Sequence, residues 1–199
     1  MKQINAFWIT PRKAATLWLY YCIGLTGPAK MQKQIYLLSL LAIVVLWAPL
    51  SDADEAVTCE VRVKFSSRGS IGEALENALH RTRSTLFVAL YGFNNEVFAQ
   101  ELVKLARRRV KVRVKIDNSK TRKKRTRRII QLLEKSGVKV QAVAPTGRNH
   151  NKFAVIDERI VITGSYNWTL RAETNWENLL ILDCPKLAKR YAEEWGKIQ

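Results

Sequence analysis

Strand-like runs alternate with helix-like runs along residues 57–143, and this alternation limits the possible folds more than any other feature of the sequence. In the first run Val61, Val63 and Phe65 recur at every second position, which predicts a strand with one half-buried side. Between the strand-like runs apolar residues recur at helical intervals, and Ser70 and Glu73 have the spacing of a capping box. The expected strands are 57–65, 85–91, 110–116 and 138–143, and the expected helices are 70–83, 96–108 and 122–136.

Strands that are joined through helices pair in parallel and carry the helices on their faces. After residue 144 the pattern changes, because the next two runs, 152–156 and 159–163, flank only Asp157 and Glu158 and predict a hairpin. A further strand at 179–183 and a closing amphipathic helix at 186–198 complete the chain. The sequence therefore predicts an α/β fold, with a mixed β-sheet flanked by helices.

One motif on this hairpin and on the loop after it carries the chemistry. Its members are His150, Lys152, Asp157, Gly164, Ser165 and Asn167, in the pattern H-x-K-x4-D-x6-G-S-x-N. Along a strand His150 and Lys152 emerge on the same face, and Gly164 allows the backbone to turn closely against an anion. An imidazole surrounded by cationic and neutral donors is equipped to break a phosphodiester without a metal. No metal or other cofactor is expected.

The motif resembles the HKD motif of the phospholipase D superfamily at every defining position. The resemblance covers about residues 57–198: residues 65–69 resemble the loop after the family's first strand, and residues 173–178 resemble the region that carries a family glutamate, here Glu177. The chain is most similar to the small bacterial Nuc-type endonucleases, and more distantly to the mitochondrial Zucchini-type members. The resemblance implies a phospholipase D-like fold with one half-site per chain.

Family members with two motifs use both histidines, one to attack phosphorus and form a phosphohistidine, the other to protonate the leaving oxygen and then activate water. This chain has one motif, so the resemblance implies a homodimer that brings two copies of His150 together. A monomer with a degenerate site is the alternative.

Each candidate catalytic residue has an expected role. His150 is the nucleophile or the acid, and Lys152 and Asn167 bind the non-bridging oxygens and stabilise the transition state. Ser165 hydrogen-bonds the phosphate or orients the imidazole, and Glu177 holds the second nitrogen of the His150 ring. Asp157 belongs to the motif, but its place in the hairpin turn favours a structural role over a catalytic one.

The charge of the chain indicates its partners. There are 34 Lys and Arg residues against 17 Asp and Glu, which favours polyanions such as nucleic acid or an anionic membrane. Seven of the nine residues 120–128 are basic, just after an expected strand. The candidate substrate-binding residues are Lys120, Arg122, Lys123, Lys124 and Arg125. With no base-reading signature, the sequence predicts a sequence-nonspecific nuclease on DNA or RNA. The alternatives are a phospholipase D acting on headgroups and a non-catalytic nucleic-acid or membrane-binding module.

Residues 31–53 have the layout of a signal peptide, with a lysine, an apolar run and small residues before a cut after Ala53. An uncleaved membrane anchor and a buried core helix are the alternatives. Residues 1–30 are interpreted as a misassigned extension and residues 54–199 as the phosphodiesterase domain. A periplasmic or secreted protein is expected, in which Cys59 and Cys184 could form a disulfide.

Overall fold

The computed structural model describes residues 56–144 and 146–199. The expected N-terminal extension at 1–30 and the expected signal peptide or anchor at 31–53 lie outside these residues. Among the helices that are described, none is both long and apolar enough to cross a membrane.

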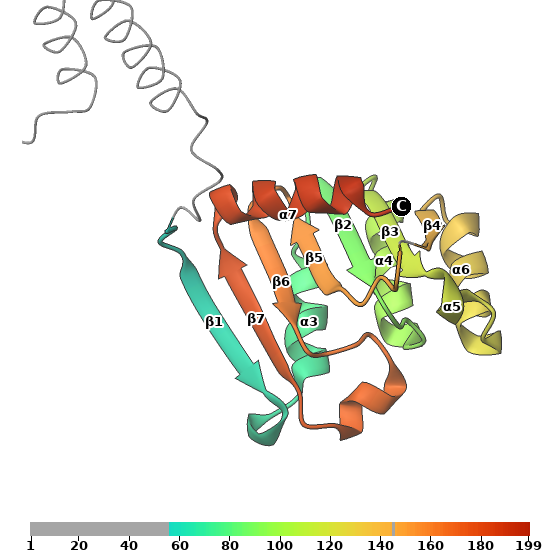
Figure 1. Cartoon of the computed structure of the whole chain (residues 1–199), viewed down its shortest axis with the longest axis horizontal. Coiled ribbons are helices and arrows are strands. Elements are labelled where there is room, and N and C mark those ends of the chain that lie inside the picture. The colour runs from blue at the N-terminus through green and yellow to red at the C-terminus, as the bar shows by residue number, and fades with distance from the viewer. Residues whose placement is uncertain (1–55, 145) are drawn as a thin grey trace, which may run out of the picture. The chain divides into compact units, whose positions relative to one another are not determined.

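The centre of the fold is a seven-stranded sheet in the order β1-β7-β6-β5-β2-β3-β4 (Figure 1). The strands are β1 Glu60–Phe65, β2 Thr85–Leu90, β3 Lys111–Asp117, β4 Lys139–Val143, β5 Lys152–Ile156, β6 Ile160–Gly164 and β7 Asn178–Asp183. β2, β3 and β4 pair in parallel, as expected for strands joined through helices. The other neighbours pair antiparallel, so the predicted mixed sheet is confirmed.

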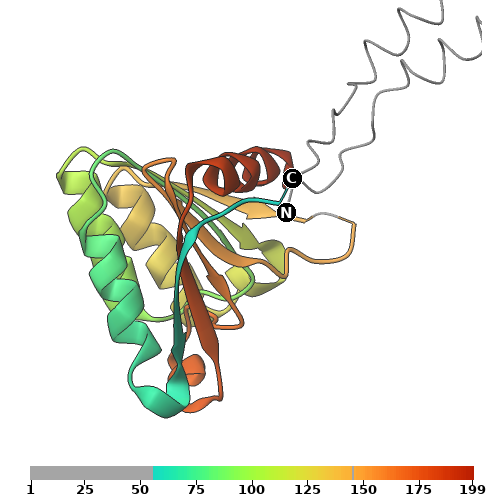
Figure 2. The same cartoon turned by 90° about the vertical axis from the view of Figure 1, so that its left-hand side faces the viewer.

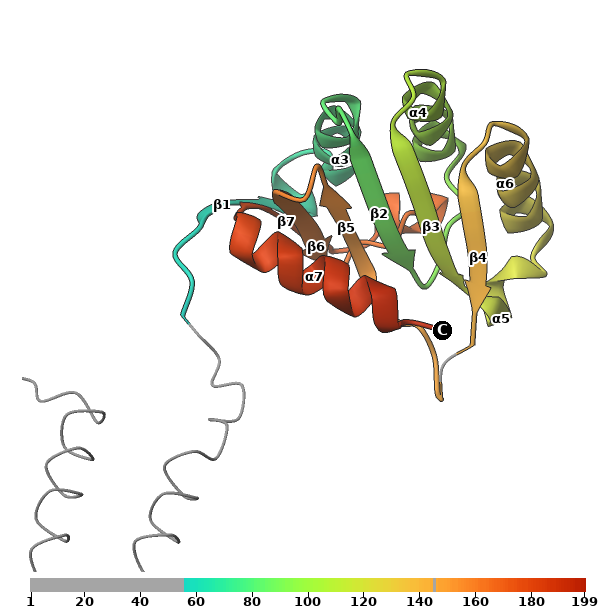
Figure 3. The same cartoon turned by 90° about the horizontal axis from the view of Figure 1, so that it is seen from above.

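Helices cover both faces of the sheet, with α3, α4 and α6 on one face and α7 on the other (Figure 3). The helices are α3 Ile71–His80, α4 Glu96–Arg107, α5 Asn118–Thr121, α6 Lys124–Lys135 and α7 Pro185–Lys197, with 3-10 turns η1 at Ser66–Arg68 and η2 at Leu170–Thr174. The predicted cap is present, since the Ser70 hydroxyl accepts from the Glu73 N–H. The short α5 was not predicted, because four residues are too few to show a helical period.

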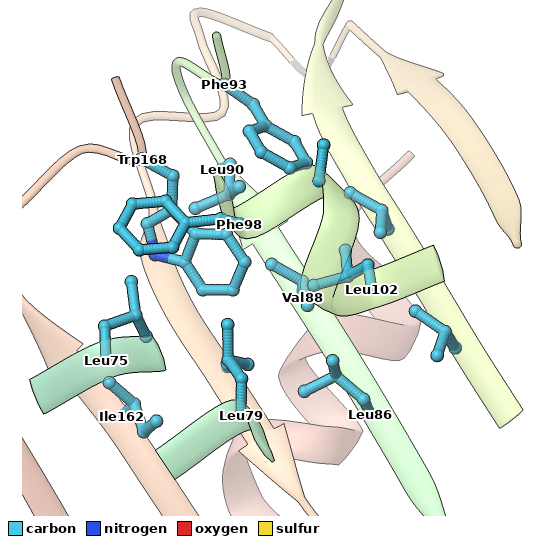
Figure 4. Close-up of a cluster of buried hydrophobic side chains, with 14 of the residues drawn as sticks. Leu75, Leu79, Leu86, Val88, Leu90, Phe93, Phe98, Leu102, Ile162 and Trp168 are labelled. Atoms are coloured by element: carbon cyan, nitrogen blue, oxygen red, sulfur yellow. The ribbon is translucent and has the colours of Figure 1, made fainter. Parts of the chain in front are cut away.

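Aromatic rings fill the larger core, beneath α3, α4 and α6. Trp168 lies between Phe93 and Phe98, with ring centroids 5.7 Å away in both cases (Figure 4). All three side chains are fully buried, together with Leu75 and Leu79 of α3. Trp168 comes from the chain after β6 and Phe93 from the chain after β2, so this core joins the two segments on which the motif depends.

A smaller core lies under α7, where Trp195 stacks on Phe87 at 5.1 Å between centroids. The Trp195 indole N–H donates to the Val88 carbonyl at 2.9 Å, and the buried Lys115 ammonium donates to the carbonyls of Trp195 and Ile198. These bonds fix the C-terminal helix against the sheet.

Strand β1 departs from the prediction, which expected one half-buried side. Val61, Val63 and Phe65 are 50%, 51% and 50% exposed, because β1 is the edge strand, nearest the viewer in Figure 2, and pairs only with β7. Leu182, the ladder partner of Val61, packs in the core under α7, so the side chains on this side of β1 point to the α7 face. Helix α7 itself lies over β2, β5 and β6. An apolar strip therefore stays open beside β7.

The two ends of the sheet differ in what their strands carry. At one end, called here the Asp157 end, β5 turns into β6 through Asp157 and Glu158, whose φ angles are 51° and 54°. The Cys59–Cys184 disulfide ties the start of β1 to the end of β7 at this same end. At the other end, called here the His150 end, β2, β3 and β6 finish and β5 begins (Figure 1).

Candidate active site

His150 lies on the loop that leads from β4 to β5 and passes β3 and β2 on the way. The Asn149 N–H donates to Oδ2 of Asp117, the last residue of β3, at 2.8 Å. The Tyr91 N–H, just after β2, donates to the Asn151 carbonyl at 2.8 Å. Because these bonds hold the residues on either side of His150, the imidazole is fixed at this end of the sheet.

Lys152 folds back onto His150. Its ammonium Nζ lies 3.2 Å from the His150 Nδ1 and donates to the His150 carbonyl at 2.8 Å. A ring nitrogen this close to an ammonium acts as the acceptor, so the neutral imidazole carries its proton on Nε2. The predicted proximity of His150 and Lys152 is thus present in the structure.

Tyr91 contacts several of the side chains around His150, and these residues are called here the catalytic cluster. Tyr91 was not among the predicted site residues. Its ring lies 4.5 Å from the His150 ring, centroid to centroid. The Lys120 ammonium lies 4.2 Å from the Tyr91 centroid and that of Lys152 at 5.7 Å, while Arg148 donates to the phenol oxygen at 2.8 Å. Three cationic side chains therefore surround one phenol next to the motif histidine.

The surroundings favour the uncharged form of His150. Burial lowers the pKa of the imidazole, and the positive charges of Lys152, Arg148 and Lys120 lower it further, against an opposing effect of Asp117. The ring is therefore neutral at neutral pH, the state that a nucleophile requires. Hydrogen bonding from Lys120 likewise lowers the pKa of Tyr91.

Ser165 and Glu177 meet across the start of β7. The Ser165 hydroxyl donates to the Glu177 carboxylate and accepts from the Asn178 N–H at 3.1 Å. Gly164 makes this approach possible, since a Cβ on it would stand 2.3 Å from the Asn178 carbonyl oxygen, and its φ is 151°. Any other residue at 164 would push Ser165 away from Glu177.

Asn167 is placed by the segment after β6, which is bound to the segment after β2. The Trp168 carbonyl accepts from the N–H groups of Asn94 and Asn95 at 3.0 and 3.2 Å. Within the described residues the buried Asn167 Oδ1 has no hydrogen-bond partner. A buried polar atom without a partner costs free energy, which is commonly accepted at functional sites.

Two predicted site residues, Asp157 and Glu177, form no hydrogen bond with His150 among the described residues. Asp157 lies one strand length from Lys152, where its carboxylate accepts from the N–H groups of Arg83, Ser84 and Thr85. It is therefore outside the catalytic cluster, in the structural place that the hairpin turn indicated. Glu177 bonds Ser165 and the Asn175 amide within this chain, whereas Nδ1 of His150 faces Lys152. The expected contact of Glu177 with the imidazole is absent from the described residues of the single chain.

The five basic residues predicted to bind substrate also divide into one that lies at the site and four that do not. Lys120 reaches the cluster through Tyr91, whereas the others are exposed around the start of α6 and have no hydrogen bond or ion pair with the motif residues inside the described ranges. Those others are Arg122, Lys123, Lys124 and Arg125. They are positioned to extend a positive surface outward from the site.

Sequence reasoning missed Tyr91, Asp117, Arg148 and Asn149. A signal for two of them was available, because Tyr91 and Asp117 lie at the carboxyl ends of two neighbouring parallel strands, β2 and β3, where sites of α/β sheets gather. Within residues 56–144 and 146–199, no group of three or more His, Cys, Asp or Glu side chains could hold a metal ion.

The protein-family model "Cardiolipin synthase, PLD-like domain" matches residues 75–198, which include the whole motif. The chain belongs to the phospholipase D superfamily. It is 28% identical over 142 residues to a phospholipase D of Rickettsia felis, covering 71% of this chain and 70% of that protein. It is 34% identical over 133 residues to the mitochondrial cardiolipin hydrolase of Mus musculus, covering 66% of this chain and 59% of that protein.

Two solved structures have the same fold as this chain. Nuc of Salmonella typhimurium, a phospholipase D family member, aligns with a TM-score of 0.68 at 25% identity, over 71% of this chain and 94% of Nuc. NucT of Helicobacter pylori aligns with a TM-score of 0.59 at 22% identity, over 70% and 96%. The chain is thus a phosphodiesterase of this superfamily, and the alternative of a non-catalytic binding module does not stand.

Proposed function

We propose that the protein is a metal-independent phosphodiesterase that cleaves DNA or RNA without sequence preference through a phosphohistidine. The observation that carries this proposal is His150, an imidazole with a lowered pKa among the cations Lys152, Arg148 and Lys120. The neutral ring supplies the nucleophile, and Lys152, which lies against the ring, supplies the charge that a phosphorane-like transition state needs.

The reaction proceeds in two steps. Lys152 moves from Nδ1 of His150 to a non-bridging oxygen of the bound phosphate, which allows the ring proton to shift and Nε2 to attack phosphorus. As the phosphorus–nitrogen bond forms, the bond to the leaving oxygen breaks and that oxygen takes a proton from the partner's His150, which is the imidazolium in this complex because the phosphate anion bound between the two rings stabilises one added proton. Water then attacks the phosphohistidine, gives its proton to the partner's His150, and releases the first His150 with both histidines restored.

The second histidine requires a homodimer, and the open strip on β1 supports one. Phe65 pairs with Asn178, whose N–H binds Ser165, so the Phe65 end of the exposed apolar strip adjoins the site. A second copy that covers Val61, Val63 and Phe65 would remove this apolar surface from water and bring two sites together. In this dimer Glu177, bonded to Ser165 in its own chain, holds the imidazole of the partner's His150.

Interface disruption tests the dimer. Phe65→Asp places a charge in the strip and should give a monomer by sedimentation analysis that no longer hydrolyses DNA. Val97→Asp, at an equally exposed valine on α4, is the control and should stay dimeric and active. A monomeric Phe65→Asp protein with full activity would refute the shared site.

Hydrolysis in a chelator tests the chemistry. The purified protein should cleave plasmid DNA and RNA in EDTA, and His150→Ala should abolish cleavage while DNA binding remains. His80→Ala, at the other histidine of the chain on α3, is the matched control and should retain activity. Loss of wild-type activity in EDTA, or cleavage by His150→Ala, would overturn the mechanism.

Lipid hydrolysis is the second candidate, and two exposed side chains favour it. Trp176, which is 88% exposed beside Glu177, and Leu170, which is 45% exposed, lie on the loops at the His150 end. Tryptophan is enriched at membrane–water interfaces, and relatives are named phospholipase D and cardiolipin hydrolase. Headgroup release from phosphatidylcholine or cardiolipin vesicles, without cleavage of nucleic acid, would establish this function instead.

We also propose that the domain works outside the cytoplasm, in the periplasm or the medium, with an uncleaved anchor as the alternative. The Cys59–Cys184 disulfide supports this proposal, since such bonds persist in oxidising compartments. N-terminal sequencing of the protein from fractionated cells tests it: a start near residue 54 is expected, and a cytoplasmic protein with free thiols would refute it.

A further inference from the structure

Lys120 and Arg148 lie beside the motif but face a different point from Lys152. Both contact Tyr91. The Lys120 ammonium lies 4.2 Å from the ring centroid, and the Arg148 guanidinium donates to the phenol oxygen at 2.8 Å. The Tyr91 ring also contacts the His150 ring, at 4.5 Å between centroids. The Tyr91 ring therefore lies between the two cations and the nucleophile. Both cations contact Tyr91, whereas Lys152 also contacts the imidazole of His150 itself.

The cations at this point, Lys120, Arg148 and Lys152, outnumber the two carboxylates, and the attraction between Asp117 and Arg148 acts without direct contact. Two carboxylates lie nearby, Asp117 and Glu177, and both are engaged: Asp117 is buried and binds Ser119 and Asn149, and Glu177 binds Ser165 and Asn175. Within the described residues, neither Lys120 nor Arg148 forms an ion pair with a carboxylate. Two cations held together on a phenol, with no carboxylate in direct contact among the described residues, can bind an external anion.

We propose that Tyr91, Lys120 and Arg148 form a second phosphate subsite, which binds the phosphate next to the scissile one in a polynucleotide. The proposal rests on the proposed nuclease function and specifies its substrate. Lys152 and His150 take the scissile phosphate, the Arg148 guanidinium and the Lys120 ammonium take its neighbour, and the Tyr91 ring sets the spacing between the two. A substrate with one isolated phosphodiester leaves this subsite empty.

The course of the chain beyond Lys120 favours a polymer over a lipid with two phosphates. Basic residues continue from the subsite along α5 and the exposed side of α6, where Arg122, Lys124 and Arg125 face solvent. A polymer of phosphates can follow such a surface for several nucleotides, whereas a lipid headgroup ends within the site.

Dinucleotides that differ by one phosphate test the subsite. The full-length protein is assayed with the thymidine dinucleotide TpT, which has one phosphodiester, and with pTpT and TpTp, which carry a terminal phosphate on one side or the other. One of the two phosphorylated forms should have a kcat/KM at least about tenfold above that of TpT, the gain expected for one charge-assisted contact. The other should resemble TpT, because the subsite lies on one side of His150.

Substitutions then assign the gain to these residues. Lys120→Met and Arg148→Met should each bring the ratio of kcat/KM between the phosphorylated dinucleotide and TpT close to one. The change should come from KM for the phosphorylated dinucleotide. Lys120→Arg should restore most of the ratio. Lys189→Met removes the same charge from the exposed side of α7 and should leave the ratio unchanged. Thermal unfolding of each variant shows whether it is folded.

The outcomes separate the subsite from the proposed function. Hydrolysis of TpT with no gain from either terminal phosphate would overturn the subsite and leave the nuclease intact, and so would a gain that survives Lys120→Met and Arg148→Met. Failure of the wild type on all three dinucleotides, with cleavage of cardiolipin in vesicles that weakens in Lys120→Met, would overturn both and assign the cations to a lipid.

Discussion

The two ends of the sheet use charged groups in opposite ways. At the Asp157 end, Arg159 binds Asp183 through two hydrogen bonds of 2.7 and 3.0 Å, and Asp157 collects three backbone N–H groups and the Ser84 hydroxyl. At the His150 end, Lys120 and Arg148 both contact the Tyr91 phenol, and within the described residues neither forms an ion pair with a carboxylate. Charges that are satisfied within the protein stabilise its fold, and charges left without a counter-ion are available to a substrate.

Asp117 and Asp157 allow the two ends to be compared residue by residue, because both are carboxylates that accept hydrogen bonds from backbone N–H groups at a strand end. Asp157 binds residues 83–85 and holds the start of β2. Asp117 binds the N–H groups of Ser119 and Asn149 and holds the loop of His150. In each, burial opposes ionisation, but the hydrogen bonds outweigh it and lower the pKa of the carboxyl. The same chemistry serves the fold at one end and the nucleophile at the other.

The disulfide at the Asp157 end should give the largest change, and only in stability. Cys59→Ser opens a link between residues 125 apart in sequence and should lower the free energy of unfolding by about 2–4 kcal/mol. The value of kcat/KM at 25 °C should not change, because Cys59 lies at the far end of β1 from His150. Chemical denaturation and a hydrolysis assay measure the two quantities.

Reduction of the wild type supplies the control for this change. Dithiothreitol should lower the stability of the wild type to that of Cys59→Ser and leave the variant as it was. If reduction instead slowed hydrolysis by the folded protein, the separation between a stabilising end and a catalytic end would be lost.

Matched substitutions of the two aspartates test the comparison directly. Asp117→Asn removes the charge that holds the His150 loop and should lower kcat/KM by up to about 100-fold, the scale of a small misplacement of a catalytic group. Asp157→Asn should leave kcat/KM unchanged at 25 °C and lower the free energy of unfolding by about 1–3 kcal/mol, since several hydrogen bonds to a charged acceptor are weakened.

Each aspartate variant is the control for the other, with activity and thermal unfolding measured on both proteins. A loss of activity in Asp157→Asn at a temperature where it is folded would place that residue in the catalytic machinery after all. Equal activity of Asp117→Asn and the wild type would mean that the loop holds His150 without this carboxylate.

The sequence predicted the elements of the fold well, because their patterns are local. The alternation of strands and helices, the Ser70 cap and the Asp157–Glu158 hairpin all depend on residues close in sequence. The exposure of β1 was predicted wrongly, since alternation shows which side of a strand is apolar but not whether anything covers that side. Only the sheet order, with β1 at the edge, decides it.

The residues of the site that belong to the motif could be predicted from the sequence, and the contacts made outside the motif could not. The two-residue period of a strand predicted His150 and Lys152 on one face, and the structure brings them together although His150 lies on the loop before β5. Tyr91 and Arg148 are 57 residues apart and meet only because the loop before β5 crosses β2. The partner of Glu177 depends likewise on the pairing of β6 with β7, which no local pattern contains.

The hairpin turn offers a smaller test at the Asp157 end. Glu158 has a φ of 54°, a conformation that costs free energy for a residue with a Cβ and none for glycine. Glu158→Gly should raise the free energy of unfolding by about 0.5–1 kcal/mol without changing kcat/KM. Glu158→Ala keeps the Cβ and is the control, so a similar gain in that variant would show that the charge, not the backbone, was responsible.

The smallest effect is expected in the dependence of kcat/KM on pH. There the cations Lys120 and Arg148 should act through the pKa of His150, without contacting the substrate. Burial is the largest cause of the lowered pKa of His150, and Lys120 and Arg148 add to it. Removing either cation with Lys120→Met or Arg148→Met leaves the burial and raises the pKa of the imidazole. A nucleophile is active when neutral, so the acidic limb of log(kcat/KM) should move to higher pH in both variants.

Bis(p-nitrophenyl) phosphate is the substrate for this profile, because its single phosphodiester does not depend on a neighbouring phosphate. Lys189→Met, which removes a charge far from the cluster, should keep the wild-type limb. Titration of the His150 ring by NMR should move in the same direction as the kinetics. An unmoved limb in both variants would show that Lys120 and Arg148 are screened from the imidazole. Their unbalanced charge would then act on a bound anion alone, and the nucleophile would owe its neutrality to burial and to Lys152.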